Sequence, residues 1–469
     1  MQRFIVQLRA LVPPLAVIIG VMIPQPRAFA ETLNLSTGGS FATAGNWSPA
    51  NVPNGVGANA TLNGLATASN PDQTANRSIT LDGAKTVGSI LFNNDLGSFT
   101  NSITTGTGGP LTFDAVDAGP ATINTTGTGT GNNTISVAMV LTDSLEVFVD
   151  NTSATSQAGS LNLTGAISGP GGFSKFGDGL ATFGTGLKTY TGPTVLHGGR
   201  MRISALAHPS MTSGLTINAG AQLTPLTAGI YQFGTNPVNL NGNGPATGPF
   251  SFFPGAIRPE TNVAVTIGNA IVLQSDSLIH VQGAASGGLT LTGAVSGPGR
   301  LTFTSPASDS NLGALILSGG NSYSGGTTIN GGTVRLTGAA ATLGVGEVMV
   351  NSADAMFFGA SAKLTIQTGV LDAIANSATL SLAGGGVFGF ADDGFLELEP
   401  GVNEIVGALF LGGVAQLPGT YGSSASGAMF KNDEYFFDTG ILTVIPEPSS
   451  VALLMATMVA LGGSNRRRS

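Results

Sequence analysis

The chain contains an internal repeat whose strands are interrupted by glycine turns at matching positions. Residues 161–171 (LNLTGAISGPG) recur as residues 289–299 (LTLTGAVSGPG), 128 positions later. A second element follows each copy, KTYTGPTVLHGG at 188–199 and NSYSGGTTINGG at 321–332. Because self-similar segments are the building blocks of repeat folds, this pattern constrains the architecture more than any other feature. The tyrosines of the two copies are 133 positions apart, so a small insertion separates the copies internally.

Within the copies, near 159–204 and 287–338, stretches such as Leu-x-Leu alternate and then break at Gly-Gly, Gly-Pro-Gly or Asn-Gly. Alternation directs one row of side chains inward, and glycine turns the chain between strands. The composition agrees, with 71 glycines, 42% hydrophobic residues and 9% charged residues. We therefore predict an all-β solenoid over 31–445, with coils of roughly 20–25 residues. Spacing alone leaves an antiparallel sandwich as the alternative.

One copy resembles the autotransporter-associated β-strand repeat, whose pattern is roughly L-x-L-x-G-x-N-x-Y-x-G-x-T-x-I-x-x-G-x-L. Residues 315–334 (LILSGGNSYSGGTTINGGTV) follow it closely. The earlier copy departs from it, with Lys188 where the family has Asn and Pro193 where it has Gly. The resemblance implies a right-handed parallel β-helix.

Both ends of the predicted solenoid carry segments similar to those of related exported proteins. Residues 45–54 (GNWSPANVPN) hold the only tryptophan, Trp47, which we expect to close the first coil rather than stack on a carbohydrate. Residues 416–422 (QLPGTYG) and 440–444 (GILTV) resemble a terminal hairpin. Such caps protect the end strands of a solenoid. The best candidate for an internal helix is 370–378.

The N-terminus has the pattern of a secretory signal peptide over residues 1–30. Arg3 and Arg9 precede an apolar stretch at 11–23, and Ala28 and Ala30 form a small-x-small cleavage site. We predict cleavage by signal peptidase after Ala30. A retained membrane anchor is the alternative, but the apolar stretch is short for a span of about 20 residues.

Residues 446–469 have the three parts of a sorting signal. Pro446, Glu447 and Pro448 precede an apolar stretch at 451–461, and a basic cluster follows it. The cluster consists of Arg466, Arg467 and Arg468. A short transmembrane helix followed by arginines keeps those arginines on the cytoplasmic side. Together these parts resemble the PEP-CTERM sorting domain of Gram-negative bacteria, which implies recognition and cleavage by an exosortase. A plain tail anchor is the alternative.

Charge and residue content exclude several classes of partner. The central part, 31–445, has 11 basic and 24 acidic residues, a net charge of −13, which disfavours binding to nucleic acid. Cysteine is absent, so neither disulfides nor cysteine zinc sites form. His197, His208 and His280 lack metal-ligand spacing. We therefore predict neither a cofactor nor a metal site.

The sequence contains no nucleophile elbow, P-loop or dinucleotide-binding motif. Parallel β-helices can host glycan-cleaving enzymes, so two acidic clusters require attention. These are Asp143 with Glu146 and Asp150, and Asp392 and Asp393 with Glu397 and Glu399. Glycoside hydrolysis needs two carboxyl groups about 5–9 Å apart beside a groove. We interpret the cluster at 392–399 as a solvated turn and predict no catalytic residues.

These features together predict an exported, non-catalytic protein of the cell surface or extracellular matrix of a Gram-negative bacterium. It would be held transiently at the inner membrane, sorted by an exosortase and associated with exopolysaccharide. The first alternative is an adhesin or autotransporter-like passenger. The second is a β-helix polysaccharide lyase or glycosidase.

Overall fold

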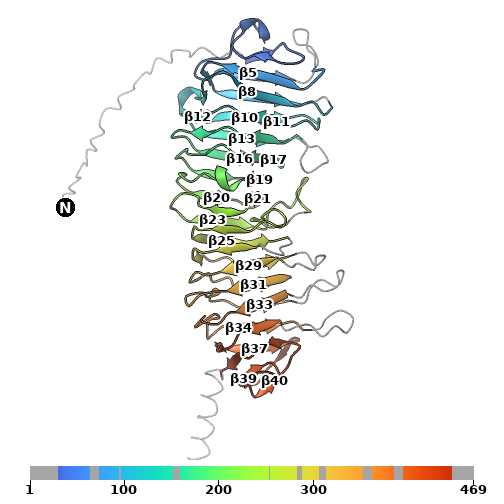
Figure 1. Ribbon diagram of the computed structural model, residues 1–469, viewed down its shortest axis with the longest axis vertical. Coiled ribbons are helices and arrows are strands. Elements are labelled where there is room, and N and C mark those ends of the chain that lie inside the picture. The colour runs from blue at the N-terminus through green and yellow to red at the C-terminus, as the bar shows by residue number, and fades with distance from the viewer. Residues whose placement is uncertain are drawn as a thin grey trace, which may run out of the picture.

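The protein is a long stack of short β-strands that cross its long axis, as the computed structural model shows (Figure 1). It describes residues 30–63, 73–94, 97–150, 159–252, 254–282, 288–305, 313–351, 362–384 and 395–445. Nearly all strand pairs in these ranges are parallel, which confirms the predicted parallel β-solenoid and excludes the antiparallel sandwich. The predicted terminal hydrophobic helices lie outside the described residues. Within the described ranges the helical segments are three 3-10 turns, η1 (Ala44–Asn46), η2 (Val116–Ala118) and η3 (Ala205–Ala207).

The coils of the N-terminal half contribute strands to three ladders, which are the faces of the solenoid, and four of these coils have a strand in the third ladder. The first ladder is β1 (Ala30–Leu33), β4 (Asn59–Asn63), β7 (Ser89–Asn93), β10 (Ala121–Thr126), β13 (Leu145–Val149), β16 (Phe173–Phe176), β18 (Thr194–Leu196), β20 (Leu215–Ile217) and β23 (Val238–Gly242). The second ladder is β2 (Gly39–Ser40), β5 (Arg77–Asp82), β8 (Asn101–Gly108), β11 (Asn133–Ile135), β14 (Leu161–Leu163), β17 (Leu180–Phe183), β19 (Gly199–Ile203) and β21 (Ala221–Pro225). The third ladder is β6 (Lys85–Val87), β9 (Leu111–Phe113), β12 (Met139–Leu141) and β15 (Ile167–Ser168).

Strand β25 (Ile271–His280) links the two halves of the solenoid. Its first residues pair with β23 and with β27 (Val295–Ser296), while its last residues pair with β28. The ladder that continues from its C-terminal part is β28 (Leu301–Thr304), β30 (Thr327–Ile329), β32 (Val348–Val350), β34 (Thr379–Leu382), β37 (Ala408–Leu411) and the antiparallel β38 (Val414–Ala415). Beside it runs a ladder of β22 (Gly229–Tyr231), β24 (Val265–Ile267), β26 (Leu289–Leu291), β29 (Ala314–Leu317), β31 (Gly332–Leu336), β33 (Ala362–Ile366), β35 (Leu396–Leu398) and β41 (Phe436–Phe437).

The coils differ in length because some contain excursions between strands. Thr194 pairs with Leu215, 21 residues later, whereas Val238 pairs with Ile271, 33 residues later. The shortest coils match the predicted length, and the longest exceed it. Constant strand register with variable connections shows that the ladders, rather than the loops, fix the architecture.

The two sequence copies occupy equivalent pairs of coils. Strands β14 to β19 of the first copy correspond in order to β26 to β31 of the second. The insertion between the copies falls between β28 and β29, where the connection is longer than that between β16 and β17. Tyr190 and Tyr323 are both fully buried, and each hydroxyl bonds a threonine four residues later, Thr194 at 2.7 Å and Thr327 at 2.6 Å.

Alternation along each strand fills the interior and leaves polar groups outside. In β13, Leu145, Val147 and Val149 are buried, while Glu146 and Phe148 face outward. The same pattern continues from coil to coil, so aliphatic side chains stack along the axis in one continuous core. These parallel strands are covered on a single face. Their hydrophobic stabilisation therefore comes from this inward row of side chains.

Two kinds of glycine in the repeat have a structural reason. Gly169 and Gly297, in the Gly-Pro-Gly turns, adopt φ values of +111° and +107°, which L side chains rarely adopt. At Gly165 and Gly293, a Cβ atom would collide with a backbone carbonyl of the preceding coil. The repeated sequence therefore specifies turns that stack closely.

The N-terminal coil is closed by an aromatic pair. Trp47 opens β3 (Trp47–Ser48), which pairs antiparallel with β1, and its side chain is 1% exposed. Its ring lies 4.8 Å from that of Phe41 in an edge arrangement, and its Nε1 donates a hydrogen bond of 2.9 Å to the Phe41 carbonyl. The expectation that Trp47 closes the first coil is confirmed, because a buried indole has no face free for a sugar.

The predicted terminal hairpin is also confirmed. Strand β39 (Gly419–Gly422) pairs antiparallel with β42 (Ile441–Val444), which pairs on its other side with β36 (Asn403–Val406). The short β40 (Phe430–Lys431) completes this small sheet. The C-terminal coil therefore ends in a cap that differs in topology from the coils before it.

The best candidate for an internal helix, 370–378, is not helical. This segment is a turn-rich connection without helical hydrogen bonds, in which Val370, Ala373 and Ile374 are buried. The backbone N–H groups of Ala373 and Ile374 donate to the carboxylate of Glu404 in the next coil, at 3.1 and 2.8 Å. A buried carboxylate from another coil thus satisfies the donors that a helix would have used internally.

We expect Trp47→Ala to destabilise the N-terminal coil, because it leaves a cavity and removes the bond to Phe41. The free energy of unfolding of this coil should fall by roughly 3–5 kcal/mol. Hydrogen exchange of residues 30–63 should accelerate, while exchange in the central coils changes little, since coils contact mainly their neighbours. The matched control is Phe252→Ala, since Phe252 is 88% exposed. Equal effects of the two changes would contradict the capping role.

Candidate functional site

The residues predicted to direct sorting lie outside the described ranges, except one. Pro446, Glu447 and Pro448, the arginines 466–468 and Ala28 are outside, while Ala30 opens β1. Their roles therefore stay predictions. In the part of the chain that is described, no helix has the length and apolar character needed to cross a membrane.

The acidic clusters form bonds between coils. Asp143 accepts a hydrogen bond of 2.8 Å from the Ala115 N–H. Glu397 accepts from the Thr365 hydroxyl at 2.9 Å. Glu399 accepts from the Thr368 N–H at 2.9 Å. Because these carboxylates bond to the preceding coil, the structure gives them a role in holding coils together. Asp392 and Asp393 lie outside the described residues.

The three histidines occupy three separate environments. His208 bonds the Ala205 carbonyl through Nδ1 at 2.5 Å and packs against Tyr231. His280 is buried, and burial, aided by Arg258, lowers its pKa to about 4. His197 lies on the outer surface of the first ladder. Across the described ranges, no group of three or more metal-ligating side chains is found.

An aromatic row follows the outer surface of the first ladder. The rings of Phe148 and Phe176 stack at 4.7 Å, and those of Phe176 and His197 stack at 4.1 Å, in three successive coils. Their register in β13, β16 and the residue after β18 places one ring above the next. Most ring faces are covered by neighbours, so the row presents mainly edges to solvent.

Amide side chains continue this row toward the C-terminus. Asn218 bonds the His197 ring at 3.2 Å, and Asn241 donates to Gln274 at 3.1 Å. The side chains of His197, Asn218, Asn241 and Gln274 are all at least partly exposed. This outer row, from Phe148 to Gln274, therefore joins aromatic edges to partly exposed amides, and we name it the outer ladder.

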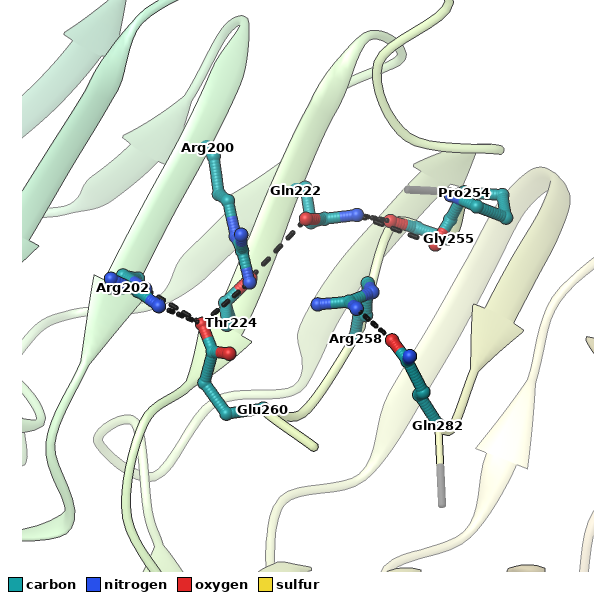
Figure 2. A network of polar contacts seen from close by, with 9 residues as sticks. All are labelled: Arg200, Arg202, Gln222, Thr224, Pro254, Gly255, Arg258, Glu260 and Gln282. Atoms are coloured by element: carbon teal, nitrogen blue, oxygen red, sulfur yellow. Dashed lines mark hydrogen bonds and ion pairs between the residues drawn. The ribbon is translucent and has the colours of Figure 1, made fainter. Parts of the chain in front are cut away.

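A polar network on the second face joins coils that are far apart in sequence (Figure 2). The carboxylate of Glu260 forms ion pairs with Arg200 and Arg202, each at 2.6 Å. Arg200 also donates a hydrogen bond of 2.9 Å to the Thr224 hydroxyl. The ring of Phe250 lies over Arg200, with its centroid 5.6 Å from the guanidinium carbon. The long excursion after β23 therefore covers β19 and β21.

The same network includes a second branch. Gln222 donates to the Gly255 carbonyl at 2.8 Å, and Arg258 donates to Gln282. Burial lowers the pKa of Arg200 to about 10, and Glu260 opposes that shift. No motif in the sequence indicates this network, because residues that bond each other in it are separated by up to 60 positions. We interpret it as a clamp between coils.

Two buried lysines replace residues that the repeat pattern would make apolar or amide. The ammonium of Lys175 donates to the carbonyls of Gly177 and Gly179 at 2.6 Å and of Gly198 at 2.7 Å. Lys188, at the family's Asn position, donates to the Gly165 carbonyl at 2.8 Å. Each lysine therefore donates hydrogen bonds to backbone carbonyls in the turns of adjacent coils. Burial lowers the pKa of both lysines to about 7.

We expect Lys175→Met to lower the free energy of unfolding by roughly 2–4 kcal/mol, because one buried and two partly buried carbonyls lose their donor. Chemical denaturation at pH 6 measures the change. Lys431→Met is the matched control, since Lys431 is exposed and should change stability by less than about 0.5 kcal/mol. If the free energy of unfolding falls no more in Lys175→Met than in Lys431→Met, the carbonyl contacts of Lys175 add nothing to stability.

Glu404 makes the stability of the C-terminal coils depend on pH. Burial raises the pKa of its carboxyl from 4.5 to about 7, against the lowering effect of the Ile374 and Ala373 N–H groups. Between pH 4.5 and 7 the folded state therefore binds more protons than the unfolded state, so stability falls as pH rises through this window. We expect a loss of roughly 2–3 kcal/mol between pH 4.5 and 7.5 that Glu404→Gln largely removes. Denaturation curves at several pH values test this, and an unchanged slope in the variant would contradict it.

Comparison with known proteins adds one match. Residues 310–336 match the family model described as passenger-associated-transport-repeat, which covers β29 to β31 of the second copy. No curated protein matches the chain, and no solved structure matches it. The match agrees with the resemblance to the autotransporter-associated repeat, and it indicates an exported, passenger-like surface protein.

Proposed function

We propose that this chain is an exported, non-catalytic structural protein of the cell surface or extracellular matrix. The observation that carries the proposal is the parallel solenoid built from a passenger-associated repeat. The carboxylates and histidines described above bond mainly within and between coils, which suits a structural body.

The route to the surface rests on the two ends of the sequence. Signal peptidase removes residues 1–30, and residues 446–469 hold the chain briefly at the inner membrane. An exosortase then recognises Pro446, Glu447 and Pro448 and cleaves near them. The basic cluster at 466–468 supports a tail that is held in the membrane with its arginines on the cytoplasmic side.

Exopolysaccharide is the partner that best fits the outer surface. The outer ladder offers amides and aromatic edges, and the neighbouring strands add threonine and serine hydroxyls. Such groups bond sugars and water without a high density of charge. The net charge of −13 over 31–445 favours neutral over acidic chains as neighbours.

An adhesin or autotransporter-like passenger is the second candidate. The passenger-associated repeat favours it directly. A specific adhesin would bind a defined host or cell-wall glycan in a saturable manner, whereas a matrix protein would be retained by bulk polysaccharide. A polysaccharide-degrading enzyme comes third, because Glu397 and Glu399 are engaged by the preceding coil.

The test is fractionation of cells that express an internally tagged chain, with Pro446, Glu447 and Pro448 intact or all changed to Ala. We expect the intact chain to lose its tail and reach the surface or matrix fraction. The variant should stay in the inner membrane, because the exosortase no longer recognises it.

The matched control is Pro418→Ala, which changes a proline in the cap and leaves the tail intact. It should be sorted like the intact chain. Equal retention of the intact chain and the triple variant would reduce the tail to an anchor and remove the main support for sorting.

A further inference from the structure

Large apolar side chains that are exposed concentrate at the C-terminal end of the solenoid. Of the sixteen such side chains in the described ranges, seven lie between residues 405 and 445. They are Ile405, Val414, Leu417, Met429, Phe430, Phe437 and Ile445. We name this set the apolar cap. The other nine are spread over the much longer part before residue 405.

Three members of the apolar cap lie on strands that end a ladder. Val414 lies in β38, which follows β37 at the end of its ladder. Phe437 lies in β41, the last strand beside β35. Phe430 lies in β40, at the edge of the terminal sheet. Exposed apolar groups on edge strands favour contact with another apolar surface.

The N-terminal end is different. Its aromatic groups, Trp47 and Phe41, are buried, and within the N-terminal coil, residues 30–63, Val56 is the one large apolar side chain that is exposed. That end is closed by its own residues. The apolar cap therefore belongs to one end of the rod rather than to solenoid ends in general.

The last residues that the structure describes lie at the apolar end of the solenoid. Strand β42 ends at Val444, beside the cap residue Ile445, and the apolar stretch at 451–461 begins six residues later. Even a fully extended connection of this length reaches only about 20 Å. If residues 451–461 enter the membrane, as the proposed sorting function requires, the apolar cap is held against the lipid surface.

We propose that the apolar cap is a membrane-contact surface that inserts side chains into the headgroup layer while the tail is anchored. The proposal rests on the proposed function of the tail. Residues 431–438 carry Lys431, Asp433, Glu434 and Asp438, a net charge of −2. Acidic groups are repelled by anionic lipid, so the surface suits a zwitterionic membrane. The solenoid then stands with its N-terminal end away from the bilayer.

The experiment uses the chain without its signal peptide, residues 31–469, in phosphatidylcholine vesicles with an indole at the cap, Met429→Trp. The matched control is Leu206→Trp in the middle of the rod, since Met429 and Leu206 are 73% and 71% exposed. Trp47 is common to both and buried. We expect brominated phosphatidylcholine to quench the cap indole at least threefold more strongly than the control. Resistance to alkaline extraction reports tail insertion separately.

Each outcome decides the proposal. Stronger quenching at position 429 in extraction-resistant protein supports it. Extraction-resistant protein with equal quenching at both positions overturns the membrane contact and leaves the anchoring tail intact. Protein that alkaline extraction removes from the vesicles overturns both the membrane contact and the anchoring role of the tail. Protection of the cap indole without vesicles, together with a concentration-dependent dimer, assigns the cap to a second copy of the chain and overturns the proposal.

Discussion

The parallel hydrogen-bond ladder between successive coils is the interaction on which the structure depends. Each strand donates hydrogen bonds to, and accepts them from, the strands of the coils on both sides, so the ladder bonds of a coil are made with its neighbours. The inward side chains stack in the same register and form one core along the axis. Everything else, including turns, clamps and caps, is arranged so that this register is kept from coil to coil.

Departures from the repeat pattern are stabilised by polar contacts across coils. Lys175 occupies an inward position that holds Phe303 in the second copy, and turn carbonyls surround its ammonium. Glu404 reaches back to the preceding coil in a similar manner. The cluster around Glu260 fastens an excursion to the outer face. Buried charge is therefore used where a coil is irregular, and apolar stacking where it is regular.

Sequence patterns predicted the features that depend on neighbours along the chain. The repeat, its glycines and the alternation predicted an all-β solenoid, and the resemblance to the autotransporter-associated repeat implied that its strands are parallel. Trp47 and the terminal hairpin predicted the caps. Contacts between coils were not predictable. The turn at 370–378 resembled a helix because its apolar spacing is helical, but its N–H groups bond Glu404, about 30 residues away. Arg200 and Glu260 meet only because an excursion folds back over β19.

A rod built from parallel ladders also has a mechanical consequence. Force applied between the two ends of the solenoid would separate one coil from the next and break few hydrogen bonds at a time. Each released coil of about 21 residues adds up to roughly 70 Å of extended chain. The solenoid can therefore lengthen stepwise under load, while the coils that remain stacked keep their structure.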